Sequence, residues 1–474
     1  MKKLKIAVIG AGPAGLTAAY QLSKQGVHVE VFEASGAVGG MAKTISLWGQ
    51  LVDLGPHRFF SSDTRVNQLW LEVIEKKYKM VNRLTRIYYQ KTFFDYPLKA
   101  FNALFGLGIF QSILCILSYI HYKFFPIKNE KTFEAWVINR FGKRLFSIFF
   151  KSYSEKLWGI SCKDLDADFA AQRIKKLSLF EAIKSAIFKS EGAKHKTLVD
   201  EFAYPNLGAG AVYIEMAKKL KKMGGIIHFN NAVESVYPQK NKNLPKLKLT
   251  KGKEMKFDHI ISSMPITTLI NRMGAPSLIK EHAKKLKFRN TLLVYLQVEA
   301  ENLFPDQWIY IHSSDLKTGR ITNFKNWVPS TVRGKKETIL CLEYWCYDDD
   351  DLWSMADKEL IKMATKEIYK TSLVPTNAVK KGHVVKVPKC YPVYGTGYQK
   401  NLKPIENYLS KQKGLSVIGR YGAFKYNNQD HSILMGILAE ENITKNAKHN
   451  LWEINTDYEY QESSKITATG LSQN

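Results

Sequence analysis

Short apolar runs alternate with helical patterns at the start of the chain. Residues Leu4 to Ile9 are rich in β-branched side chains, which predicts a buried parallel strand. An amphipathic segment follows, and Val27 to Phe32 is a second strand-like run that ends at Glu33. This order predicts a strand–helix–strand unit with two parallel strands.

Three glycines stand where the first strand turns into the helix. Gly10, Gly12 and Gly15 have the spacing G-x-G-x-x-G. The first permits a tight turn, the second lets the backbone approach a diphosphate, and the third allows close helix–strand packing. Free N–H groups at the helix N-terminus suit an anion, and Glu33 can accept hydrogen bonds from ribose hydroxyls. The unit therefore predicts a dinucleotide site, and the acid disfavours a 2′-phosphate.

A second glycine pair, Gly39-Gly40, follows soon after Glu33. This order of motifs resembles the FAD-binding superfamily of amine oxidases, protoporphyrinogen oxidases, carotenoid desaturases and UDP-galactopyranose mutases. In that superfamily the pair approaches the flavin diphosphate, because glycine has no side chain to keep the backbone away. The resemblance implies that FAD is the cofactor.

The stretch DLGPHRFF, Asp53 to Phe60, places a Gly-Pro turn and a histidine after an alternating run. It resembles the G-P-H-x-F stretch of the mutases, which lies beside the reactive nitrogen of the flavin. The resemblance implies that Gly55 and His57 lie at the ring, and the alternative is a core histidine bonded to the backbone. Phe60 stands where the mutases often carry a second histidine, so the likeness at the substrate side is incomplete.

Further segments favour the mutase branch over the oxidases. Met41 follows the glycine pair, where amine oxidases usually carry arginine. The segment FDYPLKAFN, 94–102, resembles a Tyr-Pro segment of the mutases. YSEKLWGI, 153–160, resembles their Y-x-E-K-x-W-G pattern, which includes Trp158 here and is followed by an arginine that would be Arg173.

Near the C-terminus, a strand at 415–418 meets Gly419 and then a helical pattern. Arg420 and Tyr426 have the mutase spacing, whereas amine oxidases usually carry an acid after the glycine. In the mutases the matching arginines bind the substrate diphosphate, for which a planar guanidinium is well suited, and the tyrosine orients the substrate. The alternatives are a surface arginine and a packed ring. The resemblance implies a catalytic set of His57, Trp158, Arg173, Arg420 and Tyr426. It implies a cofactor set of Gly10, Gly12, Gly15, Glu33, Gly39, Gly40, Gly55, His57, Gly419, Arg420 and Asp430.

The resemblance also implies a discontinuous flavin domain. We expect an α/β fold with α+β insertions, in which a Rossmann-like FAD-binding domain is interrupted by a helical region and by an antiparallel-sheet substrate domain. The expected ranges are 1–77, 203–265 and 385–450 for the FAD domain, 78–202 for the helical region, 266–384 for the sheet and 451–474 for a polar tail.

The segment Ala100 to Tyr122 contains no charged residue and is roughly long enough, as one helix, to cross a bilayer core. Small and polar residues recur along it at helical spacing, which predicts a helix docked by its narrow polar side. Spanning would separate the flavin motifs, so we reject it. A buried helix and peripheral contact with a membrane surface remain the two alternatives.

Two charged segments have structural explanations. The acidic run 348–351 precedes an amphipathic pattern, so we expect it to cap that helix and not to bind a metal. The Lys-rich segment 239–257 alternates like an exposed hairpin.

Composition narrows the class of partner. The net charge is +27, which attracts anions, although a basic solvated surface explains it equally well. Nucleic acid is disfavoured because no zinc finger, Walker loop or RNA-binding aromatic motif occurs. Five scattered cysteines indicate a reducing compartment. The apolar run near the N-terminus is too short for a signal peptide. We therefore expect a cytoplasmic protein, and the alternative is a protein in peripheral contact with the inner face of the membrane.

The function implied by the resemblance is that of an FAD-dependent enzyme. The leading hypothesis is mutase-like chemistry on a nucleotide- or lipid-linked sugar carrying a diphosphate, through reduced flavin, with NAD(P)H as reductant and a role in cell-surface polysaccharide synthesis. The alternative is an FAD-dependent oxidoreductase acting on an amine or apolar substrate. Met41 and Arg420 oppose this alternative, whereas the apolar segment 100–122 supports it.

Overall fold

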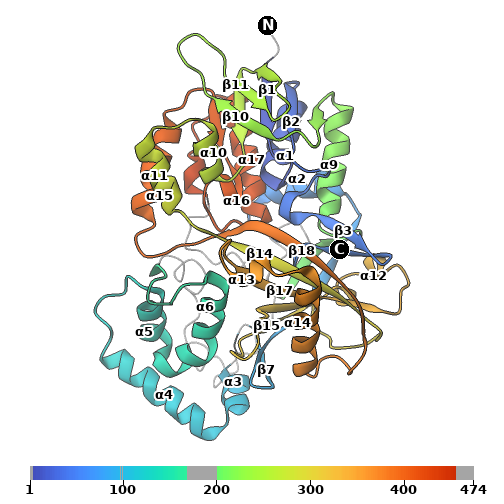
Figure 1. The fold of residues 1–474 in the computed structure, drawn as a ribbon, viewed down its shortest axis with the longest axis vertical. Coiled ribbons are helices and arrows are strands. Elements are labelled where there is room, and N and C mark those ends of the chain that lie inside the picture. Colours follow the sequence, from blue (N-terminus) through green and yellow to red (C-terminus); the bar gives the residue numbers. More distant parts are fainter. Residues whose placement is uncertain (1–3, 97, 99, 168–199, 455–474) are drawn as a thin grey trace.

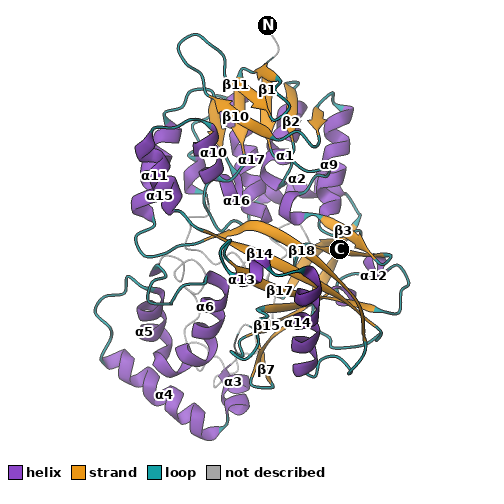
Figure 2. Ribbon diagram, in the orientation of Figure 1, coloured by secondary structure: helices purple, strands orange, loops and turns teal. Residues whose placement is uncertain are grey.

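The computed structural model of the protein describes residues 4–96, 98, 100–167 and 200–454. Three layers follow one another along its longest axis (Figure 1). A parallel sheet with helices forms one end, an antiparallel sheet crosses the middle, and a helical region forms the other end (Figure 2). Arg173 lies outside the described residues.

Five strands from distant parts of the chain form the parallel sheet, and this confirms the Rossmann-like α/β fold. The strand order is β19-β13-β1-β2-β9, and every neighbouring pair is parallel. Parallel strands are buried on both faces, which explains their continuous apolar sequences. The strands are β1 Lys5–Ile9, β2 His28–Phe32, β9 Ile226–His228, β13 His259–Ser262 and β19 Leu415–Val417. The helices that accompany them include α1 Pro13–Lys24, α2 Thr64–Ile74, α9 Gly210–Lys222 and α17 Gln429–Thr444.

A seven-stranded sheet forms the middle layer, in the order β18-β14-β17-β16-β15-β6-β7. All its pairs are antiparallel except β15 with β6. Helix α14, Asp357–Lys370, packs on β14 and β18. The strands are β6 Thr85–Tyr89, β7 Thr92–Asp95, β14 Phe288–Val298, β15 Trp308–Ile311, β16 Arg320–Asn323, β17 Thr338–Cys346 and β18 Val379–Pro392.

The edges of this sheet do not coincide with the expected domain boundaries. Strands β6 and β7 come from the range expected to be helical, and β18 continues past residue 384. The two-residue turn between β6 and β7 explains the difference, because Gln90 and Lys91 both have positive φ, of 47° and 64°. Such a turn matches the twist of a hairpin and adds two strands to the sheet edge.

Shorter elements connect these layers. The predicted hairpin at 239–257 is confirmed as β11 Lys246–Leu249 and β12 Glu254–Lys256, which extend β10 Val233–Tyr237. Two-stranded sheets pair β3 Thr44–Leu47 with β4 Gln50–Asp53 and β5 Tyr78–Asn82 with β8 Glu201–Pro205. Further helices outside the helical end are α10 Ile266–Arg272, α11 Ser277–Lys285, α12 Pro329–Val332, α15 Gln399–Ser410 and α16 Gly419–Gly422.

The helical end holds the long apolar segment. Its elements are α3 Ala100–Leu107, α4 Ile109–Phe124, α5 Phe133–Leu145, a π-helical stretch Phe146–Lys151 and α6 Ser152–Trp158. The expectation of one continuous helix over 100–122 is wrong, because Gly108 has φ +80° and separates α3 from α4. Among the described residues, no helix is both long enough and apolar enough to cross a membrane.

The acidic run does not cap the long amphipathic helix, so the prediction is wrong for that helix. Asp350 is the N-cap residue of a short helix, and its side chain makes no capping hydrogen bond there. Asp351 begins a separate four-residue helix, α13 Asp351–Ser354, and α14 starts only at Asp357. Asp350 instead accepts hydrogen bonds from the Arg289 guanidinium and from the Tyr347 N–H. The carboxylates therefore help to hold a buried arginine. Within the described ranges, no cluster of three or more His, Cys, Asp or Glu side chains suits a metal ion.

Each main sheet has a buried apolar core of its own, and a further cluster joins the two sheets and the helical end. One core joins the parallel sheet to α1, α2, α9 and α17, and includes Val8, Val31 and Leu220. Another lies between α14 and the antiparallel sheet, and includes Leu342 and Ile368. All five cysteines are buried and unpaired. The space between the sheets holds the candidate site.

Candidate functional site

The three N-terminal glycines, Gly10, Gly12 and Gly15, have different structural roles. Gly10 has φ +95° and its N–H donates to the Phe32 carbonyl, which makes the tight turn. A Cβ at Gly15 would lie 2.1 Å from the Gly10 carbonyl oxygen, so this glycine is needed for helix–strand packing. Gly12 differs, because a Cβ there would meet nothing closer than Gly40 Cα at 3.8 Å. The fold itself therefore does not require glycine at position 12.

The second glycine pair converges on the first set. The Gly39 N–H donates to the Ala11 carbonyl at 2.8 Å, and a Cβ at Gly40 would lie 3.1 Å from Gly12 Cα. Glu33 accepts from the Ala11 N–H at 2.8 Å and from Ser35, which holds the loop after β2 to the glycine turn. Helix α1 begins here with no capping side chain and no acid in its first turn. The N-terminus of α1 thus keeps its partial positive charge, which suits an anion.

A cavity of about 430 Å³ opens beside this turn, at the carboxyl ends of β1, β13 and β19. In open parallel sheets, ligands bind at this edge. Eight of the predicted site residues line it: Gly12, Gly40, Gly55, His57, Trp158, Gly419, Arg420 and Tyr426. Gly10, Gly15, Glu33, Gly39 and Asp430 are not among its lining residues.

Asp430 occupies a different environment. It is buried, 3% exposed, and its carboxylate lies 3.3 Å from His431 Nδ1 in the first turn of α17. Its predicted role in holding the cofactor therefore has no direct contact with the cavity to support it, and an influence through the N-terminus of α17 remains a prediction.

The stretch DLGPHRFF starts with Asp53, a buried carboxylate that joins several elements through hydrogen bonds. Asp53 is 0% exposed and accepts hydrogen bonds from the Thr44 hydroxyl at 2.5 Å, the Tyr204 hydroxyl at 2.7 Å and the Ala209 N–H. Burial raises the pKa of its carboxyl to about 6, although these hydrogen bonds oppose the shift. The carboxylate ties the β3–β4 hairpin to β8 and α9, and so fixes where the following turn begins.

Gly55 and His57 then reach the cavity. Gly55 has φ +87°, and a Cβ there would lie 3.5 Å from the Glu343 carboxylate. His57 Nδ1 lies 3.0 Å from the Gly55 carbonyl oxygen, which can only accept, so Nδ1 carries the proton. Burial, together with the charges of Arg320 and Arg420, lowers the His57 pKa to about 4. His57 is therefore a neutral imidazole whose Nε2 is an acceptor.

Arg420 is fixed at the opposite wall. Its Nε donates to the Cys390 carbonyl and its Nη1 to the Asn427 carbonyl, each at 2.9 Å. The guanidinium carbon lies 4.6 Å and 4.5 Å from the ring centres of Tyr391 and Tyr426. Its Nη2 is buried and has no hydrogen-bond partner among the residues that the structure describes. The structure thus holds a rigid cation with one unused donor at the cavity.

Trp158 packs against the cavity wall that contains Arg420 and Tyr426. Its side chain is 0% exposed, and its ring lies 5.8 Å from that of Tyr426 in an edge-to-face arrangement. Tyr426 is further held by its N–H, which donates to the Tyr394 hydroxyl at 2.8 Å. Trp158 therefore lies beside Tyr426 at the cavity wall, and its role in the pocket stays a prediction.

The antiparallel sheet, the residue after β15 and helix α6 contribute cavity residues that were not predicted from the sequence. Arg320 on β16 forms a bidentate pair with Glu343 on β17, with N···O distances of 2.7 Å and 2.6 Å. Tyr153 stacks on His312 with ring centres 4.8 Å apart. Burial lowers the His312 pKa to about 3, so this ring is neutral as well. All four side chains line the cavity.

Only a weak signal could have indicated Arg320 and Glu343. Glu343 lies inside β17, whose other residues are apolar or β-branched, and Arg320 begins the short strand β16; a charge in a buried strand requires a partner. The sequence does not reveal which partner each one finds, because 23 residues separate them.

The site fits the FAD that the resemblance implies. Two glycine-lined backbone segments meet at an uncapped helix N-terminus, and Glu33 lies at the end of β2, where a ribose is expected. Gly12, Gly40 and Gly419 line the cavity between this end and Arg420. Gly12, Gly39 and Gly40 would hold the diphosphate, Glu33 the ribose, and Gly55, His57 and Gly419 the ring.

Solved structures share this fold over nearly the whole chain. Reduced UDP-galactopyranose mutase superposes with a TM-score of 0.83 at 20% identity, covering 96% of this chain and 100% of the mutase chain. A putative protoporphyrinogen oxidase from Exiguobacterium sp. 255-15 gives a TM-score of 0.73 at 14% identity, covering 94% and 100%. Identities this low establish the fold alone.

Curated relatives match in part. The 4,4'-diapophytoene desaturase of Methylomonas sp is 23% identical over 337 residues, which are 62% of this chain and 61% of the desaturase. Protoporphyrinogen oxidase 2 of Arabidopsis thaliana is 40% identical over 65 residues, which are 14% of this chain and 13% of the plant enzyme. The profile described as flavin containing amine oxidoreductase matches residues 13–419. The chain therefore belongs to this family of FAD-dependent flavoenzymes.

Proposed function

We propose that the protein acts through reduced FAD on a sugar carrying a diphosphate, with mutase-like, redox-neutral chemistry. The observation that supports this most is Arg420, whose buried Nη2 has no hydrogen-bond partner in the described ranges although its other nitrogens are held in place. A guanidinium kept rigid with a donor to spare is suited to a phosphate oxygen.

The charge balance of the cavity supports the same class of substrate. Its charged lining residues are Arg58, Arg320, Arg420 and Glu343, three cations against one carboxylate. Glu343 is already used by Arg320 in the bidentate pair. The cavity therefore has a net positive charge that would attract an anionic substrate group.

The chain's own residues would have distinct roles. The flavin, when bound and reduced, supplies a nucleophilic nitrogen at the ring. Arg420 would bind a diphosphate oxygen, and Tyr426, held over its guanidinium, would orient the substrate. His57 is neutral and can accept a hydrogen bond through Nε2 without adding charge beside the ring. Trp158 and Tyr391 would exclude water from this wall. Arg173 would be a second diphosphate ligand. NAD(P)H as the source of reducing equivalents belongs to the same proposal.

One observation favours a second function. Apolar residues form another part of the cavity wall, namely Leu98, Phe133, Phe149 and Phe150. A wall of this kind suits the apolar or amine substrate of an FAD-dependent oxidoreductase, and the chain is similar to a desaturase over 337 residues. Under this second function, oxidised flavin would lose its colour on anaerobic addition of an amine, porphyrinogen or polyene.

A binding experiment separates the two functions. The holoprotein is reduced with dithionite and titrated by calorimetry with UDP and with UDP-galactopyranose, and the sugar is then assayed for conversion while the flavin stays reduced. Binding of both compounds supports the sugar diphosphate. Failure of the reduced protein to bind either compound, or any other sugar nucleotide or lipid-linked sugar diphosphate, would contradict the proposal.

The matched variants are Arg420→Lys and Arg140→Lys. The first keeps the charge but removes the planar donor group, and should weaken diphosphate binding roughly 10- to 100-fold, the equivalent of one charged hydrogen bond. Arg140 is also stacked on a ring, 3.9 Å from the Trp136 centre, but does not line the cavity. Its variant should bind UDP as the wild type does.

A further inference from the structure

Helices α3 and α4 carry an apolar face with no protein on it among the described residues. Phe110 is 73% exposed and Leu117 57%, whereas single exposed apolar residues elsewhere are scattered. Of the eighteen large apolar side chains that are exposed in the described part of the chain, nine lie in this one segment, so it differs from ordinary surface. The apolar face of α3–α4 consists of Phe105, Ile109, Phe110, Ile113, Ile116, Leu117, Ile120, Phe124 and Phe125.

The opposite side of α4 is in contact with the protein. Ser112 and Cys115 are buried against the protein, and Gln111 and Ser118 accept hydrogen bonds from Arg144. Gly142 of α5 lies so close to α4 that a Cβ there would be 2.6 Å from Tyr119 N. The helix is therefore firmly docked by its polar side, and its apolar side is held outward.

The charges around the face have one sign. Between Ala100 and Asn129 the sequence contains no Asp or Glu, and Lys123 and Lys128 are exposed. Neither lysine forms an ion pair within the described part of the chain. The face also lies at one end of the molecule, where α4 forms the lower edge in Figure 1, so a flat surface can reach it.

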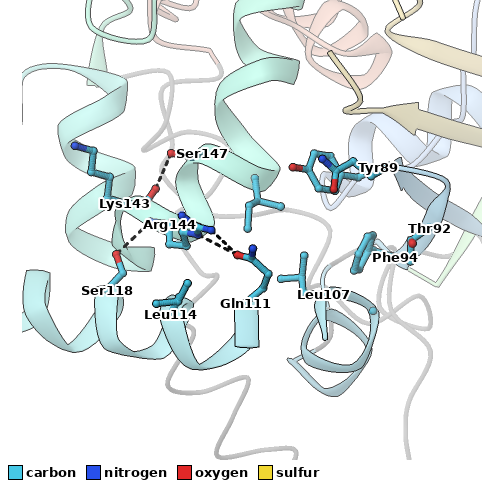
Figure 3. Close-up of a pocket in the computed structure, with 13 residues that line it drawn as sticks. Tyr89, Thr92, Phe94, Leu107, Gln111, Leu114, Ser118, Lys143, Arg144 and Ser147 are labelled. Atoms are coloured by element: carbon cyan, nitrogen blue, oxygen red, sulfur yellow. Dashed lines mark hydrogen bonds between the residues drawn. The ribbon is translucent and has the colours of Figure 1, made fainter. Parts of the chain in front are cut away.

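A second cavity lies directly behind α4, between α4, α5 and β7 (Figure 3). It has a volume of about 640 Å³, and its lining includes the cations Lys143 and Arg144 as well as the apolar residues Phe94, Leu107 and Leu114. Arg144 is held by Gln111 and not by a carboxylate, and Lys143 has no ion-pair partner among described residues. A lining with apolar residues and two cations suits a phosphate group attached to a hydrocarbon chain.

We propose that the apolar face of α3–α4 binds the surface of an anionic membrane, and that Lys143 and Arg144 bind lipid phosphate. An amphipathic helix lies in the interface with its apolar side among the acyl chains and its cations at headgroup level. A second copy of the chain fits less well, because it would bring Lys123 and Lys128 of two strongly basic molecules together. This proposal does not depend on the substrate of the enzyme.

The test is sedimentation of the holoprotein with vesicles of phosphatidylcholine, with and without phosphatidylglycerol. The variant Phe110→Gln/Leu117→Gln should lower the partition coefficient by about tenfold or more, since two large apolar side chains leave the interface. The matched control is Leu207→Gln/Leu278→Gln, whose side chains are 54% and 68% exposed elsewhere. It should bind as the wild type does, and both variants should keep the flavin spectrum.

Lys143→Gln tests the phosphate part. It should reduce the preference for phosphatidylglycerol over phosphatidylcholine several-fold and leave binding to pure phosphatidylcholine unchanged. Equal vesicle binding by the Phe110/Leu117 variant and its control would overturn the proposal. It would also be overturned if that variant changed only the dimerisation of the protein, measured by analytical ultracentrifugation, because the face would then join two copies.

Discussion

The substitution Gly12→Ala tests whether glycine at position 12 is needed for FAD binding or for folding. Gly12 has φ −78° and ψ −178°, extended backbone that any residue adopts. An added methyl group would make only an ordinary contact with Gly40 Cα at 3.8 Å. The apoprotein should therefore fold with nearly the same free energy of unfolding. The methyl group would, however, occupy space beside the cavity at the N-terminus of α1, where we expect the FAD diphosphate.

The magnitude follows from the hydrogen bonds that the diphosphate would lose. If the methyl group moves it away from two N–H groups, the loss is about 1.5–3 kcal/mol for each charged hydrogen bond. The total, roughly 3–6 kcal/mol, corresponds to an increase of about 10²- to 10⁴-fold in the FAD dissociation constant. The measurement is quenching of FAD fluorescence on titration with apoprotein, alongside thermal melts of the apoprotein.

Two other glycines provide the controls. Gly395→Ala also adds a methyl group in open space, with the nearest atoms at 3.8 Å and 4.0 Å, and should change neither FAD binding nor melting. Gly15→Ala places its methyl group 2.1 Å from the Gly10 carbonyl oxygen and should lower the melting temperature of the apoprotein itself. The reasoning would be refuted if Gly12→Ala left the FAD affinity unchanged, or if it destabilised the apoprotein as much as Gly15→Ala does.

Three further predictions concern stability. Glu343→Gln leaves the Arg320 guanidinium buried without its carboxylate and should cost about 3–5 kcal/mol in denaturant unfolding, whereas no loss would mean that the pair is exposed to solvent. Asp53 has a pKa of about 6 in the fold, above its usual 3.8, so the folded state holds this proton longer and stability falls as pH rises from about 4 to 6. Asp53→Asn should remove up to roughly 3 kcal/mol of that fall, measured by melts at pH 4 and pH 7, and an unchanged pH dependence would contradict it. Gly142→Ala, at φ +79° and 2.6 Å from Tyr119 N, should loosen α4 and speed its proteolysis without changing the flavin spectrum, and equal proteolysis rates would contradict this close packing.

The N-terminal unit could be predicted in detail because its determinants are local. The turn at Gly10, the packing of Gly15 and the acid at the end of β2 lie within one strand–helix–strand unit, so spacing along the chain is also spacing in space. The apolar and polar sides of the 100–122 segment were likewise readable from helical periodicity. Its break at Gly108 was not, since a glycine inside a helical pattern often continues the helix.

The other half of the site depended on contacts between distant segments. Arg320 and Glu343 have nothing in their own sequence to mark them as cavity residues, and only the pairing of β16 with β17 brings them together beneath Gly55. The acidic run shows the same limit, because Asp350 accepts a hydrogen bond from the buried Arg289 instead of making the expected capping bond.

The sequence by itself determined the flavin-binding unit and the residue types that its close backbone contacts require. Only the tertiary structure decided which charges share the cavity, that Arg420 keeps one unused donor, and that α4 holds its apolar side outward. The reason is physical: backbone geometry and periodicity act over a few residues, whereas desolvation and charge pairing depend on every side chain that packing brings within a few ångströms.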